Sequence, residues 1–429
     1  MSSPRAPEPP EPDPPPPVLA VRAAVIEDPG PLLALLPDQP ALAWVRDGEG
    51  MVGWGEAARW EGSGPDRFGA GRRWLADLAA RAAIGQPPGQ PAGPAPGGGL
   101  IAFGAFGFGD EAPDERDPTL RASVLIVPAL VVGRRDGAWW VSAATPAETE
   151  AGIEADEASE GGIAGDGEAG AGGDPVRALR SGGRPAAVRP IGSLSWEPGA
   201  CSAPAWGAAV ARAIEAIRAG RADKVVLARD LIARADAPID PRAVLSALAG
   251  RYPSCWTFSV DGLIGATPEL LVRAERGIAE SRVLAGTLRR QLGPAADSAA
   301  AELEASEPEL EASEREASEP APELKAAERV ASERELKASE REASEPAPEL
   351  EASEREASER EASERELERA LLASAKDRRE HELSVQSVVA ALAPHCRALS
   401  VPPEPFVLHL PNVLHLASDL RGELADAAS

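Results

Sequence analysis

Hydrophobic and polar residues follow one another along the chain in the two periods that distinguish strands from helices. In the first part, from Val18 to about Ser142, apolar runs of strand length predominate. The strands expected there are Ala41–Arg46, Leu100–Phe108 and Ser123–Gly133. Arg72–Ala83 instead repeats its apolar residues at helical spacing, which predicts a helix within this strand-rich region.

A second stretch with regular apolar spacing begins near Ile191. Three helices are predicted in it, over Trp206–Arg218, Pro241–Ala249 and Leu367–Ala391. Strands are predicted where short apolar runs lie between turn residues. These runs are Lys224–Leu231, Trp256–Val260, Gly262–Ala266 and Leu270–Ala274, and a further apolar segment, Val407–Leu416, follows the last helix.

Three segments lack any apolar period. Residues 1–17 are rich in Pro and are predicted to form a disordered tail, and residues 146–190, rich in Gly, Ala and Glu, a flexible linker. Residues 298–366 repeat variations on Glu-Ala-Ser-Glu-Arg and Glu-Ala-Ser-Glu-Pro. The folded part is therefore expected in residues 18–145, 191–297 and 367–429.

The repeat cannot bury a face. Its five-residue period advances about 500° around a helix, so each position drifts by about 140° per repeat and no apolar stripe persists. Residues 301–370 hold 24 acidic and 10 basic residues, which accounts for −14 of the net charge of −25. A low-complexity insertion within a loop is the expected interpretation, with an acidic interaction arm as the alternative.

The composition limits the partners and the compartment. A net charge of −25 argues against a nucleic-acid-binding protein, because phosphates would repel such a surface. No apolar run approaches the roughly 18 residues that span a bilayer, and the first residues lack the apolar region of a secretory signal. Cys201, Cys255 and Cys396 lie far apart and form no pair, so a reducing, cytoplasmic location is expected. The sequence gives no indication of the oligomeric state.

Five short motifs point to one kind of chemistry. They are Lys-Val-Val-Leu-Ala-Arg (224–229), Gly-Ala-Thr-Pro-Glu-Leu-Leu-Val (265–272), Leu-Ala-Gly-Thr (284–287), Ser-Ala-Lys-Asp-Arg-Arg-Glu-His (374–381) and Leu-Pro-Asn-Val-Leu-His-Leu-Ala-Ser (410–418). In this order they resemble the chorismate-binding enzymes, and among these the isochorismate synthases. Residues 44–48, 53–57 and 103–108 resemble the N-terminal part of the same branch.

The resemblance implies a catalytic base and a catalytic acid. Lys224 matches the lysine that activates water for attack at C2 of chorismate, and burial in a strand would lower its pKa toward the working pH. Glu269 matches the acid that protonates the departing C4 hydroxyl, and its apolar neighbours would raise its pKa. The alternative for Lys224 is a surface lysine at the turn between a helix and a strand, and the alternative for Glu269 is an exposed residue at the end of a strand.

The resemblance also implies a metal ion and contacts to the substrate. Glu380 matches the glutamate that binds Mg²⁺, for which oxygen ligands are suited. His415 matches a histidine near the departing hydroxyl, and Gly286 and Thr287 match a turn that contacts chorismate. A zinc site built from the four histidines fits poorly, because their spacing matches no compact ligand pattern.

The fold implied by the resemblance is α+β, with two packed antiparallel-rich sheets flanked by helices. Family members continue beyond the histidine motif, and that part supplies a second magnesium-binding glutamate, an arginine and a Gly-rich segment. None of these has a counterpart in the 429 residues, so a truncated catalytic domain with impaired activity is expected. Isochorismate would feed menaquinone or siderophore synthesis. A salicylate synthase, an inactive remnant and a protein that acts through its acidic repeat remain as alternatives.

Overall fold

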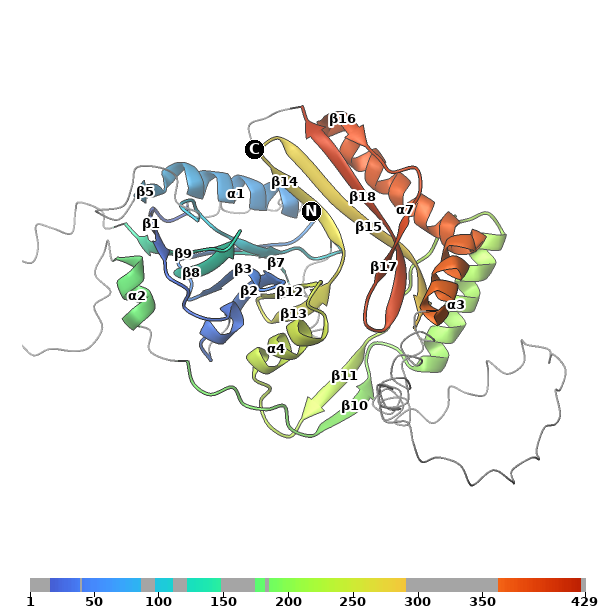
Figure 1. Cartoon of the computed structure of the whole chain (residues 1–429), viewed down its shortest axis with the longest axis horizontal. Coiled ribbons are helices and arrows are strands. Elements are labelled where there is room, and N and C mark those ends of the chain that lie inside the picture. The colour runs from blue at the N-terminus through green and yellow to red at the C-terminus, as the bar shows by residue number, and fades with distance from the viewer. Residues whose placement is uncertain are drawn as a thin grey trace, which may run out of the picture. The chain divides into compact units, whose positions relative to one another are not determined.

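The computed structural model describes residues 16–38, 41–85, 97–110, 122–147, 174–181, 185–290 and 362–425. The chain divides into two compact units. Unit 1 contains Met1–Ser193 and Ala235–Pro268, and unit 2 contains Leu194–Arg234 and Glu269–Ser429. Both units combine helices with mainly antiparallel sheets, which confirms the predicted α+β class (Figure 1).

Unit 1 is built on an eight-stranded sheet with the order β13-β12-β2-β3-β8-β9-β1-β5. Its strands are β1 (Leu19–Ile26), β2 (Ala41–Arg46), β3 (Glu49–Trp54), β5 (Ala83–Gly85), β8 (Leu130–Arg135), β9 (Ala138–Pro146), β12 (Trp256–Val260) and β13 (Leu263–Thr267). Two-residue turns join three of its strand pairs. Each turn has a glycine in second place and an aspartate with positive φ in first place, at Asp47, Asp136 and Asp261. Asp-Gly is a strong signal for such hairpins, because both central residues need positive φ.

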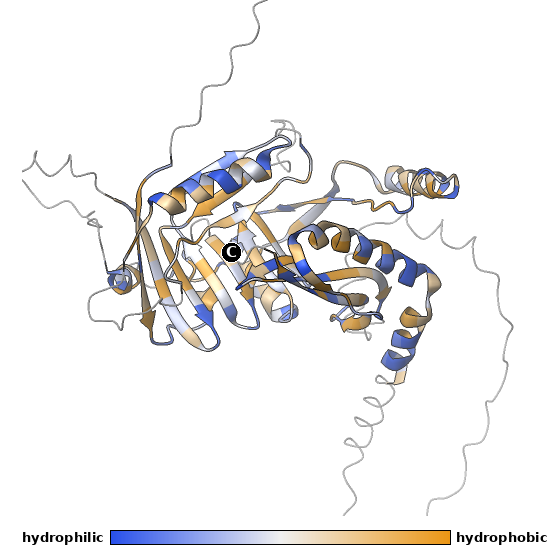
Figure 2. Cartoon of the chain, turned by 90° about the horizontal axis from the view of Figure 1, so that it is seen from above, coloured by the Kyte–Doolittle hydropathy of each residue, from blue (hydrophilic) through white to orange (hydrophobic). Residues whose placement is uncertain are grey.

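Both faces of this sheet are covered. On one face, Ala43, Val45 and Val132 pack with η1 (Leu32–Leu35), α2 (Pro175–Ser181) and α4 (Pro241–Arg251). On the other face, Leu42 and Val260 pack with the three-stranded sheet of β4 (Ala58–Gly62), β7 (Ser123–Val127) and β6 (Phe103–Ala105). The helix α1 (Arg67–Arg81) packs against β4 and β7, and its hydrophilic side is plain in Figure 2.

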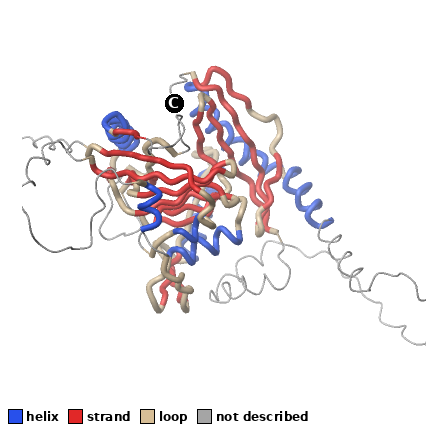
Figure 3. Tube along the Cα trace, turned by 60° about the vertical axis from the view of Figure 1, so that its left-hand side comes forward, coloured by secondary structure: helices blue, strands red, loops and turns tan. Residues whose placement is uncertain are grey.

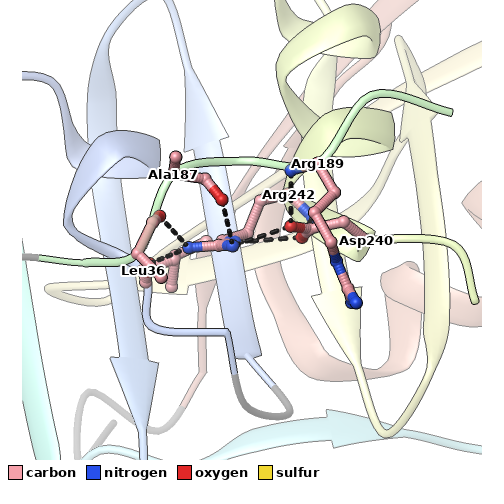
Figure 4. A network of polar contacts seen from close by, with 6 residues as sticks. Leu36, Ala187, Arg189, Asp240 and Arg242 are labelled. Atoms are coloured by element: carbon pink, nitrogen blue, oxygen red, sulfur yellow. Dashed lines mark hydrogen bonds and ion pairs between the residues drawn. The ribbon is translucent and has the colours of Figure 1, made fainter.

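A buried ion pair fastens α4 to the rest of unit 1 (Figure 4). The Arg242 guanidinium donates to the Asp240 carboxylate at 2.9 and 2.7 Å and to the Ala186 carbonyl at 2.9 Å. It also reaches the carbonyls of Leu36 and Ala187, both at 3.5 Å. Asp240 caps the N-terminus of α4, so one buried pair joins the helix start, the end of η1 and the chain that follows residue 185.

Unit 2 contains a sheet with the order β14-β15-β18-β16, and β17 pairs with β18 as well. These strands are β14 (Leu270–Glu275), β15 (Ile278–Arg289), β16 (Cys396–Ser400), β17 (Phe406–His409) and β18 (Val413–Leu424). The helix α7 (Ala375–Leu392) packs on β15, β18 and β16 and so covers one face of this sheet (Figure 3). A helical segment at 362–373 precedes α7, and η3 (Ala393–His395) follows it. The helix α3 (Ala203–Arg218) and the paired strands β10 (Leu194–Pro198) and β11 (Leu231–Ala235) complete the unit.

Several predicted boundaries were wrong. The run at 123–133 forms two strands, because Pro128 lacks the N–H that a continuous strand needs. The strand expected at 100–108 covers only Phe103–Ala105, and the helix expected from Arg72 begins at Arg67. The linker expected at 146–190 contains α2, whose Val176 and Leu179 pack against the core of unit 1.

In unit 2 the helix expected from Trp206 begins at Ala203, and the apolar segment expected at 407–416 falls on two strands, β17 and β18. Two further departures change an element itself. The single helix expected over 367–391 is divided at Ser374, whose hydroxyl accepts from the Asp377 N–H and thereby caps α7. The strand expected over 224–231 is not formed before Leu231, and residues 224–230 have no regular secondary structure. The expected tail lies almost wholly outside the described residues, as do most of the linker and nearly all of the 298–366 repeat.

Candidate active site

Helix α7 carries the expected metal ligand. Its capped N-terminus fixes the first turn, and Glu380 follows on the second, with its side chain 36% exposed. Ser384 lies four residues further on, so it shares a face of the helix with Glu380. Its hydroxyl donates to the Glu380 carbonyl at 3.1 Å.

Lys224 reaches this face of α7 from a distant part of the chain. Its Nζ lies 2.8 Å from the Ser384 hydroxyl oxygen and 3.8 Å from a Glu380 carboxylate oxygen. The side chain is 28% exposed and stands on a segment without regular structure, so the expected burial in a strand is wrong. The structure nevertheless places the expected base beside the expected metal ligand.

Gly286 lies at a β-bulge within β15 and not in a separate turn, which corrects the expected position. Its φ of 79° is in the left-handed region that favours glycine. A Cβ at this position would come within 3.0 Å of the Asp377 Cβ and 3.1 Å of the Asp377 carbonyl oxygen. Glycine therefore permits both the bulge and the close approach of β15 to the first turn of α7.

His381 ties α7 to the same bulge. The ring is buried, with Nδ1 3.2 Å from the carbonyl oxygen of Ala285 and Nε2 2.8 Å from the hydroxyl of Ser418 on β18. Burial lowers the pKa of His381, with a smaller contribution from the positive charge of Lys224. A neutral ring that donates from Nδ1 and accepts at Nε2 satisfies both partners, so this residue holds helix and sheet in register.

Thr287 and His415 face one another across β15 and β18. They are a directly opposed cross-strand pair, and the Thr287 hydroxyl oxygen lies 2.9 Å from His415 Nδ1. Burial lowers the pKa of His415, while a hydrogen bond to the Gly286 backbone acts in the opposite direction. The pair thus presents a hydroxyl and a neutral imidazole directly beside the bulge at Gly286.

Glu269 lies immediately before β14, whose Leu270 pairs with Arg282 of β15. The residue is exposed, so the expected apolar enclosure of its carboxyl group is wrong. The other five expected residues are connected through α7, the bulge of β15 and β18. Strand pairing places Glu269 at the end of the neighbouring strand.

Two polar residues were missed as contributors by sequence reasoning. Ser384 contacts a lysine 160 positions away, and no local pattern predicts such a contact. His381 belongs to the motif at 374–381, but its role in joining α7 to Ala285 and Ser418 was not predicted. The Glu-His pair at 380–381 on a predicted helix was the available signal.

The described residues contain no group of three or more His, Cys, Asp or Glu side chains that could hold a metal ion. Mg²⁺ can be held by one or two carboxylates with water and substrate oxygens, so Glu380 is suited to serve as one ligand. Within the part of the chain that the structure describes, none of the helices combines the length and apolar character that a membrane-spanning helix needs.

Comparison with known proteins gives consistent matches. A family model described as chorismate binding enzyme matches residues 37–316, and a second model with that description matches residues 354–429. The salicylate biosynthesis isochorismate synthase of Pseudomonas aeruginosa is 29% identical over 251 residues, which are 57% of this chain and 38% of that protein. Isochorismate synthase EntC of Escherichia coli is 29% identical over 219 residues, 50% of this chain and 39% of that protein. The matched regions thus span less than two fifths of these relatives.

The fold is shared with a solved structure, that of MenF, the menaquinone-specific isochorismate synthase from Escherichia coli. The TM-score is 0.55 at 17% sequence identity, and the match covers 96% of this chain and 72% of that one. At this identity the likeness shows the fold alone.

Proposed function

Because the chain belongs to the chorismate-binding enzyme family, we propose that it converts chorismate to isochorismate. In this reaction water adds at C2 and the C4 hydroxyl leaves. The observation that supports the proposal most strongly is the 3.8 Å distance between Lys224 Nζ and a Glu380 carboxylate oxygen. The proposed base thus lies beside the proposed metal ligand. The names of the matched relatives agree with this reaction.

Lys224 acts as the base in the proposed reaction. Its nitrogen, in the neutral form, takes a proton from water as the water oxygen bonds to C2. Glu269, exposed at the start of β14, gives a proton to the departing C4 hydroxyl. Thr287 and His415 supply a hydroxyl and a neutral imidazole as hydrogen-bonding groups for substrate oxygens. The Thr287 Oγ1 and the His415 Nδ1 lie 2.9 Å apart.

Mg²⁺ is the proposed cofactor, with Glu380 as its ligand from the described residues. When bound, the ion would neutralise a carboxylate of chorismate and help to orient the substrate. Two carboxylate ligands would hold Mg²⁺ more firmly than one. A site in which Glu380 is the single carboxylate ligand would therefore bind Mg²⁺ weakly and would turn over slowly.

The proposal is tested by incubating the purified chain with chorismate and Mg²⁺ and resolving the products by chromatography. We expect isochorismate from the unmodified chain and none from Lys224→Ala. Lys376→Ala is the matched control, since Lys376 is an exposed lysine on α7, and it should retain the activity.

Other products would redirect the proposal. Salicylate with pyruvate would identify a salicylate synthase. A folded sample that yields no product, or equal activity in Lys224→Ala, would contradict the proposed reaction. Deletion of residues 298–366 tests the alternative role of the acidic repeat, which predicts loss of a binding partner with unchanged chorismate chemistry.

A further inference from the structure

We infer that Ser384 is a positioning residue that holds the Lys224 side-chain nitrogen where it activates water. The inference deepens the proposed function and rests on it for the role of Lys224. It stands on the 2.8 Å contact between Lys224 Nζ and the Ser384 hydroxyl oxygen, which is shorter than the 3.8 Å separation of Nζ from the Glu380 carboxylate.

Lys224 needs such an anchor because its own backbone segment gives little support. Residues 224–230 belong to no helix or strand, so no ladder of backbone hydrogen bonds fixes the segment as a strand. Val225 and Val226, which follow the lysine, are 41% and 80% exposed and so pack only partly against other residues. A lysine side chain has four rotatable bonds, and its nitrogen samples many positions unless a partner holds it.

Ser384 can provide this anchor because it is itself held. It lies on the fourth position after Glu380 within α7, and its hydroxyl hydrogen is directed to the Glu380 carbonyl at 3.1 Å. Its oxygen is therefore left to accept, and Lys224 must be the donor in their contact. The helix is joined in turn to the sheet through His381 and its bonds to Ala285 and Ser418.

The direction of this hydrogen bond has a chemical consequence. A neutral lysine amine that donates one N–H to the Ser384 hydroxyl does not direct its lone pair at that hydroxyl. The lone pair is left available to accept a proton from water. Ser384 therefore limits the positions of the Lys224 nitrogen and the directions of its lone pair, and the same face of the helix carries the Glu380 carboxylate. Without the hydroxyl, Lys224 would keep its chemistry but lose the preferred orientation.

The kinetic test compares three variants. Ser384→Ala should lower kcat about tenfold to a hundredfold with KM nearly unchanged, since a misplaced catalytic group can cost about a hundredfold in rate. Ser384→Thr keeps the hydroxyl and should restore most of the rate. Ser387→Ala is the matched control, because Ser387 is an exposed serine on the same helix, and it should leave kcat unchanged.

A second measurement tests the contact independently of turnover. The chain has four lysines, at 224, 325, 337 and 376, so ¹⁵N-lysine labelling gives a simple spectrum of side-chain nitrogens. The Lys224 signal, assigned by its loss in Lys224→Arg, should show slowed hydrogen exchange. Ser384→Ala should remove this protection, whereas Ser384→Thr and Ser387→Ala should preserve it.

The two measurements separate the two proposals. If the unmodified chain forms no isochorismate, the proposed function fails, and loss of exchange protection in Ser384→Ala would still support the anchoring of Lys224. If Ser384→Ala changes neither kcat nor the Lys224 signal, the inference about Ser384 is overturned while the proposed function stands. An equal fall of kcat in Ser384→Thr would also overturn it, because the hydroxyl would then be irrelevant.

Discussion

Replacing Arg242 by alanine should destabilise unit 1 far more than breaking an exposed ion pair of the same chemistry. The Arg242 and Asp240 side chains are 3% and 1% exposed, and the guanidinium also donates to three backbone carbonyls. Its removal leaves a buried carboxylate with backbone amides as its remaining donors. The expected loss of unfolding free energy is about 3–5 kcal/mol. The control is Arg73→Ala, since Arg73 and Asp66 are 60% and 70% exposed, and it should cost less than about 1 kcal/mol.

Urea unfolding followed by tryptophan fluorescence is the suitable assay, because seven of the nine tryptophans lie in unit 1.

The pH dependence of stability gives a second measurement of the same ion pair. The hydrogen bond from Arg242 holds the pKa of the Asp240 carboxyl well below its usual range. The stability that this carboxylate contributes is therefore present at neutral pH and is lost as the pH falls toward the lowered pKa. Asp240→Asn should flatten the fall in stability between about pH 5 and about pH 2. Equal losses in Arg242→Ala and Arg73→Ala, or an unchanged acid dependence in Asp240→Asn, would refute this reasoning.

Two further variants test the frame of the candidate site. Gly286→Ala should lower the free energy of unfolding by about 1–3 kcal/mol, because an alanine there has a strained φ and its Cβ meets Asp377. Thermal unfolding followed by circular dichroism measures the loss, and Gly207→Ala is the control. Gly207 has open space around its Cβ position within α3, so that change should stabilise, and a similar effect of both changes would contradict the account. Burial lowers the pKa of His381, so the unfolded chain binds its proton more readily and stability should fall as the pH drops below about 6.5. His381→Gln should reduce that dependence between pH values on either side of about 6.5, measured as urea midpoints, and an unchanged slope would count against a buried neutral ring.

The strands whose ends were predicted correctly are those that a recognisable turn sequence follows. β2 and β12 begin and end at the predicted residues, and each is followed directly by an Asp-Gly turn, at 47–48 and 261–262. The break at Pro128 and the cap at Ser374 were also readable, since proline lacks a donor and serine caps helices. Apolar spacing alone does not contain these two signals, which explains the merged elements.

The segment that begins at Lys224 shows the limit of pattern reasoning. Lys-Val-Val-Leu-Ala has the composition of a buried strand, yet a strand also needs a neighbour that accepts and donates its backbone hydrogen bonds. Which neighbour is available depends on the tertiary structure and not on the five residues. The same holds for Ser384, since its partner is distant in the sequence.

The site residues themselves could be named because motifs, and not periodicity, carried them. The placement of Glu380, Gly286, Thr287 and His415 on connected elements follows from the helix cap, the bulge and the pairing of β15 with β18. The burial of Lys224 and of Glu269 could not be predicted, because exposure depends on the atoms that surround a side chain.

The central claim, that this chain adds water to chorismate at C2, is tested most directly by turnover in ¹⁸O-labelled water. Mass spectrometry of the isochorismate should show one labelled oxygen, located at C2, and the label should be absent in the Lys224→Ala reaction because no product forms. Isochorismate that carries no label, or a labelled product formed equally well without Lys224, would contradict the account.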